Sequence, residues 1–195
     1  MKENNKPRPS GPAIFMYCVI AVTAITAAVC FILFYGGHTD SGFVQWTGIT
    51  TFTIMYHLWL RIIMGNVTKL FKISYTQPWF HEKAFEKKLY ELLRVKKWKD
   101  KALTYNPELF SLKDNSLQSI ANTMSKAETD HWVNELISLS TLFFGLIFGS
   151  GFVAFLITAI AAMLFDGQFI VIQRYNRPRV VRLIEKQKAA KQPSP

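Results

Sequence analysis

Residues 132–173 read WVNELISLSTLFFGLIFGSGFVAFLITAIAAMLFDGQFIVIQ, an apolar stretch of some 42 positions. At roughly 1.5 Å of helix per residue, this length is enough to cross a hydrocarbon layer of about 30 Å twice. Small residues, which favour a tight turn, lie near its middle: Gly145, Gly149, Ser150 and Gly151. The stretch therefore predicts a transmembrane hairpin, and the residues that follow it, 174–195, form a basic tail.

Two more apolar blocks precede this hairpin. Residues 13–35 contain no charged side chain over 23 positions, which is about 34 Å of helix. Residues 43–64 are apolar except for Arg61 near their end, and half of all 195 residues are hydrophobic. We therefore expect an all-α integral membrane protein with about four transmembrane helices. Residues 1–12 are expected to form a charged tail before an uncleaved first span.

Basic residues are distributed unevenly between the predicted loops. The net charge is +10, and the 23 Lys and Arg residues fall in the N-terminal tail, at Arg61, between Lys69 and Lys126, and from Arg174 onward. The positive-inside rule then predicts a multi-pass protein of the cell membrane with both termini and residues 67–131 in the cytoplasm. Because the charge follows membrane topology, a nucleic-acid partner is not expected.

The segment 67–131 contains a candidate interfacial helix. From Phe80 to Trp98 apolar residues recur at mostly helical spacing and basic residues fill the other face, which predicts a cytoplasmic amphipathic helix lying on the membrane. Trp98 and Lys99 lie in a lysine-rich stretch at its end. A headgroup-level anchor explains them, and the alternative, an electropositive ledge for an anionic lipid or a phosphorylated donor, is compatible with it.

An arginine cluster follows the hairpin directly. Three guanidinium groups stand where hydrocarbon gives way to water, interleaved with polar side chains that a simple stop signal does not need; the cluster comprises Gln173, Arg174, Tyr175, Asn176, Arg177 and Arg179. Arginine forks bind phosphate and carboxylate bidentately. We interpret the cluster as a shaped binding site. Just before it, Asp166 and Gly167 interrupt the apolar run, so the last span is expected to end or kink there, with 169–172 as a short connection.

Glu128 and His131 are the candidate catalytic residues. They are three positions apart and share one face of a helix that is expected to begin near Ser116. An imidazole can accept a proton from a hydroxyl, and a neighbouring carboxylate can orient the ring. A solvated helix start, with its acidic residues near the N-terminus, explains the same pattern without catalysis. His57 is a weaker candidate, because a histidine inside a span needs a polar cavity.

Sequence motifs for other enzyme classes are absent. The chain has no HExxH, paired CxxC, GxxxxGK[ST], GxGxxG or GxSxG pattern, so no cofactor is predicted. Cys18 and Cys30, the two cysteines, lie in the first apolar block and about 18 Å of helix apart, too far for a disulfide. No metal site is predicted.

Three blocks of this chain resemble the glycosyl-4,4'-diaponeurosporenoate acyltransferases, membrane enzymes that esterify the sugar of a glycosylated carotenoid. The blocks are Val95 with Lys97–Lys99, Glu128 with His131 and Trp132, and 170–172 leading into 173–179. The resemblance covers about residues 50–185. The chain differs from the family in its additional N-terminal span and in Asp166 and Gly167, which stand where an Asn and Pro break is usual.

The resemblance implies transfer of a fatty acyl group to a hydroxyl of a glycolipid or glycosylated isoprenoid at the cytoplasmic face. We expect His131 to act as general base, Glu128 to orient it, and the arginines to bind an anionic acyl donor, either acyl-CoA or a phospholipid, or to stabilise oxyanion charge. These groups should then converge on a single pocket at the inner leaflet.

The same residues are compatible with two other functions. Small helical membrane methyltransferases and reductases also place C-terminal Arg, Tyr and Asn residues around a cytoplasmic cofactor pocket. A non-enzymatic lipid-binding or scaffold subunit would use the arginines only to hold headgroups.

Overall fold

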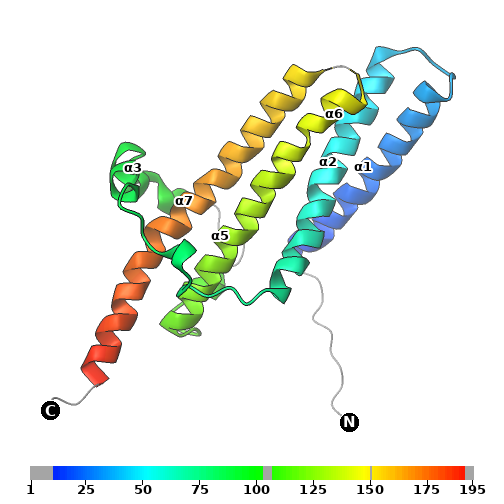
Figure 1. The fold of residues 1–195 in the computed structure, drawn as a ribbon. Helices are drawn as coiled ribbons and strands as arrows, with labels where there is room; N and C mark the ends of the chain where they lie inside the picture. Colours follow the sequence, from blue (N-terminus) through cyan, green and yellow to red (C-terminus); the bar gives the residue numbers. More distant parts are fainter. Residues whose placement is uncertain (1–10, 103–106, 150, 192–195) are drawn as a thin grey trace, which may run out of the picture. The chain divides into compact units, whose positions relative to one another are not determined.

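The computed structural model describes residues 11–102, 107–149 and 151–191, and the chain divides into two units, residues 1–63 and 64–195. The described residues are helical or lie in turns and loops, so the predicted all-α class is confirmed. Figure 1 shows the helices that make up each unit. The site described below lies within the second unit.

The first unit consists of α1 (Gly11–Tyr35) and most of α2 (Gly42–Val67). The two helices approach closely at Gly48, where an added Cβ would lie 2.9 Å from the Phe31 ring. This contact explains why a residue without a side chain stands at that position.

The second unit is built on an antiparallel pair of long helices, α5 (Leu117–Ser140) and α7 (Phe152–Lys191), joined by α6 (Leu142–Ile147) (Figure 1). The Ser116 hydroxyl caps α5 by accepting a hydrogen bond from the Ser119 amide at 3.1 Å, which supports the predicted start of this helix. The chain turns between α6 and α7 at Gly149 and Gly151, whose φ angles are 66° and 77°. Glycine adopts this left-handed conformation without steric cost.

Short elements connect α2 to α5. They are η1 (Thr68–Leu70), η2 (Pro78–Phe80), α3 (Glu86–Leu92), α4 (Val95–Trp98), η3 (Lys99–Lys101) and η4 (Pro107–Phe110). Thr68 and Lys126 both bond to Asp130, which fixes η1 against α5.

The single amphipathic helix expected over Phe80–Trp98 is wrong in its length. Arg94, at φ 50° and ψ 39°, separates α3 from α4 with a left-handed residue that an α-helix cannot contain.

The prediction that the last span ends or kinks at Asp166 is also wrong, because α7 continues through that position to Lys191. Asp166 is buried and accepts hydrogen bonds from α5, which removes the cost of placing a carboxylate inside an apolar helix. The expected basic tail is consequently helical as far as Lys191 and includes Pro178 within the helix.

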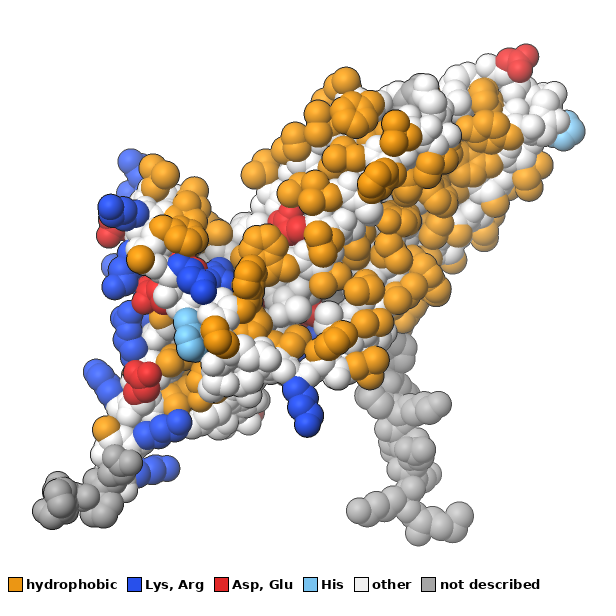
Figure 2. All heavy atoms as spheres, in the orientation of Figure 1, with side chains coloured by type: hydrophobic (Ala, Val, Ile, Leu, Met, Phe, Trp, Pro, Cys, Tyr) orange, Lys and Arg blue, Asp and Glu red, His pale blue; other side chains and the backbone are white. Residues whose placement is uncertain are grey.

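Among the residues that the structure describes, two helices rather than the four expected are long and apolar enough to cross a membrane: Ile14–Tyr35 and Phe152–Lys191. The predicted third span fails because its apolar residues are divided between the end of α5 and the six-residue α6. The predicted second span is diluted by polar residues of α2, among them His57 and Arg61. Figure 2 shows hydrophobic side chains over the first half of α7 and basic ones over its second half and the segment around α3.

Candidate functional site

The centre of the site is a buried pair of arginines on α7 that bind one carboxylate of α5. Glu128 is fully buried, and each of its oxygens meets a guanidinium: Oε1 lies 2.5 Å from Nη1 of Arg174, and Oε2 lies 2.6 Å from Nη1 of Arg177. Two cations therefore share one anion in a region of low dielectric, where both attraction and repulsion are strong. A second anion is required to balance the charge.

Glu86 of α3 supplies that second anion. Its Oε1 lies 2.6 Å from Nη2 of Arg174, so this guanidinium bridges two carboxylates and the two positive and two negative charges balance. The Tyr90 hydroxyl donates to the other oxygen of Glu86 at 2.8 Å. Burial raises the pKa of the Tyr90 phenol, and its bond to Glu86 raises it further, so the phenol stays protonated as a donor.

The loop around η2 holds the arginines from the other side. Arg177 donates from Nε and Nη2 to the Phe80 carbonyl at 3.1 and 2.9 Å, and its guanidinium lies 4.9 Å from the Phe80 ring centre. Arg174 donates to the Trp79 carbonyl at 3.3 Å. The side chain of Arg177 is 2% exposed and that of Arg174 is 12% exposed. Arg177 is thus enclosed by protein, whereas Arg174 reaches an open surface.

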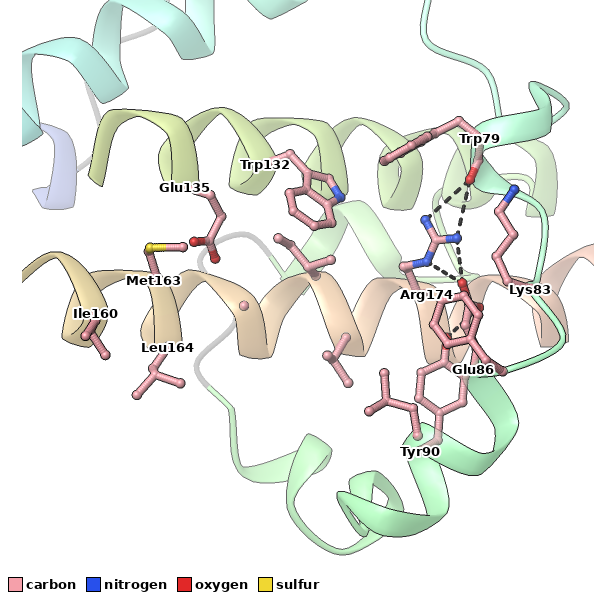
Figure 3. Close-up of a pocket in the computed structure, with 15 residues that line it drawn as sticks. Trp79, Lys83, Glu86, Tyr90, Trp132, Glu135, Ile160, Met163, Leu164 and Arg174 are labelled. Atoms are coloured by element: carbon pink, nitrogen blue, oxygen red, sulfur yellow. Dashed lines mark hydrogen bonds and ion pairs between the residues drawn. The ribbon is translucent and has the colours of Figure 1, made fainter. Parts of the chain in front are cut away.

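That surface is an apolar groove of about 770 Å³ between α3, α5 and α7 (Figure 3). Hydrophobic side chains dominate its wall: Phe85, Leu89, Ile160, Met163, Leu164, Ile170 and Val171. At one end lie Arg174, Glu86 and Lys83, and towards the other end Glu135 projects from α5 beside Met163. The groove therefore combines an apolar length with a charged end, where Arg174 and Lys83 lie beside Glu86.

His131 forms a separate polar pair with α7. Its Nδ1 lies 2.8 Å from Oδ1 of Asp166, and the Asn134 amide donates to the same oxygen at 3.1 Å. The ring stacks on Phe169 with 4.8 Å between centroids. A carboxylate bonded to Nδ1 fixes the ring so that Nε2 becomes the proton-accepting atom, which is the arrangement of a general base.

The expected pairing of His131 with Glu128 is therefore wrong. Both oxygens of Glu128 bind arginines, and the carboxylate that contacts the imidazole is Asp166. Sequence spacing placed Glu128 and His131 on one face of α5 but could not show that α7 brings a different partner to each of them.

The expected single pocket for the imidazole and three guanidiniums is not formed by the described residues. The groove lining includes Trp132 and Gly167, which follow His131 and Asp166 in the chain, but neither member of that pair. Arg177 instead borders a second cavity of about 460 Å³. The exposed Arg179 stacks on Tyr175 of its own helix at 3.7 Å.

Other residues singled out in the sequence have local contacts. Trp98 donates from its indole to the Leu93 carbonyl at 2.9 Å, and Lys99 pairs with Asp100. Gln173 and Asn176 are half-buried on α7. His57 belongs to the first unit, where its ring meets Tyr56 edge to face. Within the described ranges, no group of three or more His, Cys, Asp or Glu side chains could hold a metal ion.

Sequence reasoning missed three acidic members of the site: Glu86, Glu135 and Asp166. A signal was available for the latter two, because a carboxylate within an apolar helix is costly and is retained where it has a role. Glu86 had no such signal, since it stands in a segment of mixed charge and is identified only by the long-range contact with Arg174.

Comparison with known proteins identifies the family. The family model described as glycosyl-4,4'-diaponeurosporenoate acyltransferase matches residues 76–186, more than half of the chain, and this range contains the arginine network, the groove and the pair of His131 with Asp166. No curated protein and no solved structure matches the chain. The resemblance seen in the sequence is confirmed: the chain belongs to the glycosyl-4,4'-diaponeurosporenoate acyltransferase family and is an acyltransferase of carotenoid glycoside synthesis.

Proposed function

We propose that this protein transfers a fatty acyl group to a sugar hydroxyl of a glycosylated carotenoid, with the acyl donor bound in the groove that ends at Arg174. The family implies an acyl donor and a glycosyl carotenoid acceptor. The observation that carries the proposal is the apolar groove of about 770 Å³ with Arg174 and Lys83 at one end, beside Glu86. Its wall suits a hydrocarbon chain, and its end suits an anion.

Arg174 is proposed to bind the anionic part of the donor, which is a coenzyme A phosphate or a phospholipid headgroup. Glu86 and Glu128 hold the guanidinium in place before the donor arrives, so little conformational freedom is lost on binding. Arg177 serves this arrangement indirectly, because it shares Glu128 and anchors the Phe80 loop.

His131 is proposed to act as the general base, with Asp166 orienting it. Nε2 of the imidazole would take the proton of the acceptor hydroxyl while the hydroxyl oxygen attacks the donor carbonyl. The tetrahedral intermediate would then collapse, and the departing thiolate or alkoxide would receive that proton. The resulting imidazolium is stabilised by the adjacent Asp166 carboxylate, which lies 2.8 Å from Nδ1.

The remaining assignments concern the surroundings of the groove. We propose that the two termini and the basic segment 67–131 face the cytoplasm, as the distribution of Lys and Arg favours. Trp98 and Lys99 would then contact headgroups, while the polar residues of the cluster border the donor: Gln173, Tyr175, Asn176 and Arg179. The two long apolar helices suggest association with the membrane.

The direct test is mass spectrometry of lipid extracts from cells that make the glycosylated carotenoid, with and without this protein. A mass gain of one fatty acyl chain on the glycoside is expected. Product should be lost with His131→Ala and Arg174→Ala, although both variants insert into the membrane. A methylated or reduced product, or binding of S-adenosylmethionine or a nicotinamide cofactor, would refute the proposal in favour of another enzyme class.

A further inference from the structure

Glu135 is a carboxylate in the groove wall to which neither the arginine network nor the general base assigns a task. It lies on α5 one turn after His131, and its side chain is 7% exposed. In Figure 3 its carboxylate points from α5 towards α7, beside Met163 and apart from the charged end at Arg174 and Glu86. The groove thus has an acidic position within its otherwise apolar half.

The opposite helix leaves room for this carboxylate. Gly167 of α7 lines the same groove, and a Cβ added there would lie 3.5 Å from Oε1 of Glu135. A methyl group would make ordinary van der Waals contact, whereas a larger side chain would take the space of the carboxylate. A glycine within a helix lowers helix stability by about 1 kcal/mol relative to alanine. The space that Gly167 leaves for the carboxylate therefore comes at a cost in the stability of α7.

Helix geometry gives the position of Glu135 relative to His131, the proposed base, and to Arg174, the proposed anion-binding residue. Residues four apart on a helix lie on the same face, with about 5–6 Å between their Cβ atoms, so Glu135 stands next to His131. Gly167 and Arg174 are seven residues apart on α7, which is about 10 Å along the helix. A donor whose anion is bound by Arg174 can therefore extend along the groove to Glu135 and Gly167, which are the chain neighbourhood of the His131–Asp166 pair that lies outside the groove lining.

We infer that Glu135 is an acceptor-binding residue, whose carboxylate accepts a hydrogen bond from a sugar hydroxyl of the acceptor and orients it beside His131. Ionised carboxylates form strong hydrogen bonds with hydroxyl donors, and these bonds gain strength in an apolar wall. A hydrocarbon chain offers no such donor, so the acidic position selects the hydroxyl-bearing substrate. This inference rests on the proposed function and adds the residue that recognises its acceptor.

Steady-state kinetics with the full-length protein in detergent test the inference, using a glycosyl-4,4'-diaponeurosporenoate as acceptor and palmitoyl-CoA or a phosphatidylglycerol as donor. Glu135→Gln should raise the KM for the acceptor about tenfold or more, because a charged hydrogen bond becomes a neutral one. The KM for the donor and the release of fatty acid by transfer to water should stay within twofold. Glu135→Asp should recover part of the acceptor affinity.

Substitutions at Gly167 of α7 test the role of the Glu135 carboxylate independently. Gly167→Val should raise the acceptor KM as Glu135→Gln does, because its side chain would take the space of the carboxylate. Glu91→Gln, at an exposed position of α3, is the matched control and should alter neither KM.

The outcomes separate the inference from the proposed function. If the unchanged protein acylates the glycoside but Glu135→Gln leaves the acceptor KM unaltered, or raises the donor KM instead, the acceptor-binding role is wrong and the acyl transfer stands. If the unchanged protein gives no acylated glycoside with either donor, the proposed function is wrong and the inference falls with it.

Discussion

Replacing Glu128 with glutamine tests whether this residue acts through the two arginines. The carboxylate is fully buried and binds Arg174 at 2.5 Å and Arg177 at 2.6 Å. Glutamine keeps the shape but has one acceptor oxygen, so it turns an NH₂ donor towards one guanidinium. Removing one partner of a buried ion pair costs about 3–5 kcal/mol, because the other charge stays buried without compensation.

The expected magnitude can be expressed as a melting temperature. For a domain of this size about 1 kcal/mol corresponds to roughly 2–4 °C, so Glu128→Gln should lower the Tm by about 6–20 °C in detergent, followed by tryptophan fluorescence. Glu91→Gln, at an exposed site, is the matched control and should change the free energy of unfolding by less than about 0.5 kcal/mol.

A double variant separates this interaction from general damage. Arg177→Met should lower the Tm by itself, and combining it with Glu128→Gln should cost less than the two losses added together, because both remove the same contact. A Glu128→Gln protein that keeps its Tm but loses acyl transfer would refute this reasoning, since Glu128 would then act on the substrate directly.

Three further predictions follow from the same contacts. Arg174→Lys should raise the KM for the donor about tenfold in the kinetic assay, because a lysine cannot bridge Glu86 and Glu128 while facing the groove; an unchanged donor KM would contradict anion binding there. His131→Ala should lower kcat by about 10²- to 10⁴-fold with little effect on either KM, and Asp166→Asn should do the same to a smaller extent; a full kcat in His131→Ala would exclude the general base. Tyr90→Phe should cost about 1 kcal/mol near neutral pH. The folded-state pKa of Tyr90 lies above the ordinary value of 10.0, so its contribution is present below pH 10 and is lost as pH rises through the folded pKa; the Tm difference between the two proteins should therefore shrink in strongly alkaline buffer, and a difference that persists there would contradict the bond to Glu86.

The helical class was predictable because long apolar runs allow few other structures. The glycines near residue 150 marked the turn, and Ser116 marked the start of α5. The break at Asp166 was predicted wrongly, because a carboxylate in an apolar run signals a helix end only when no partner is present. Here His131 and Asn134 provide that partner from α5.

The residues that belong to the candidate site could be predicted better than the contacts that they make with one another. Glu128, His131, Arg174 and Arg177 all lie at the α5–α7 contact, as their residue types suggested. Their partners could not be deduced, because spacing along one helix fixes which side chains share a face but not the register of the second helix. The left-handed conformation of Arg94, which divides the expected amphipathic helix, also could not be predicted from its residue type.

Photoaffinity labelling most directly tests the claim that the donor occupies the groove ending at Arg174. A fatty acyl-CoA or a phospholipid with a diazirine in its acyl chain would be bound to the intact protein, illuminated, and the labelled peptides identified by mass spectrometry. We predict labels on the groove wall, at residues 160–171 of α7 and at residues 85–90, where α3 begins, that decrease in Arg174→Ala. Labels confined to the exposed apolar surface around 136–146, unaffected by Arg174→Ala, would contradict the account.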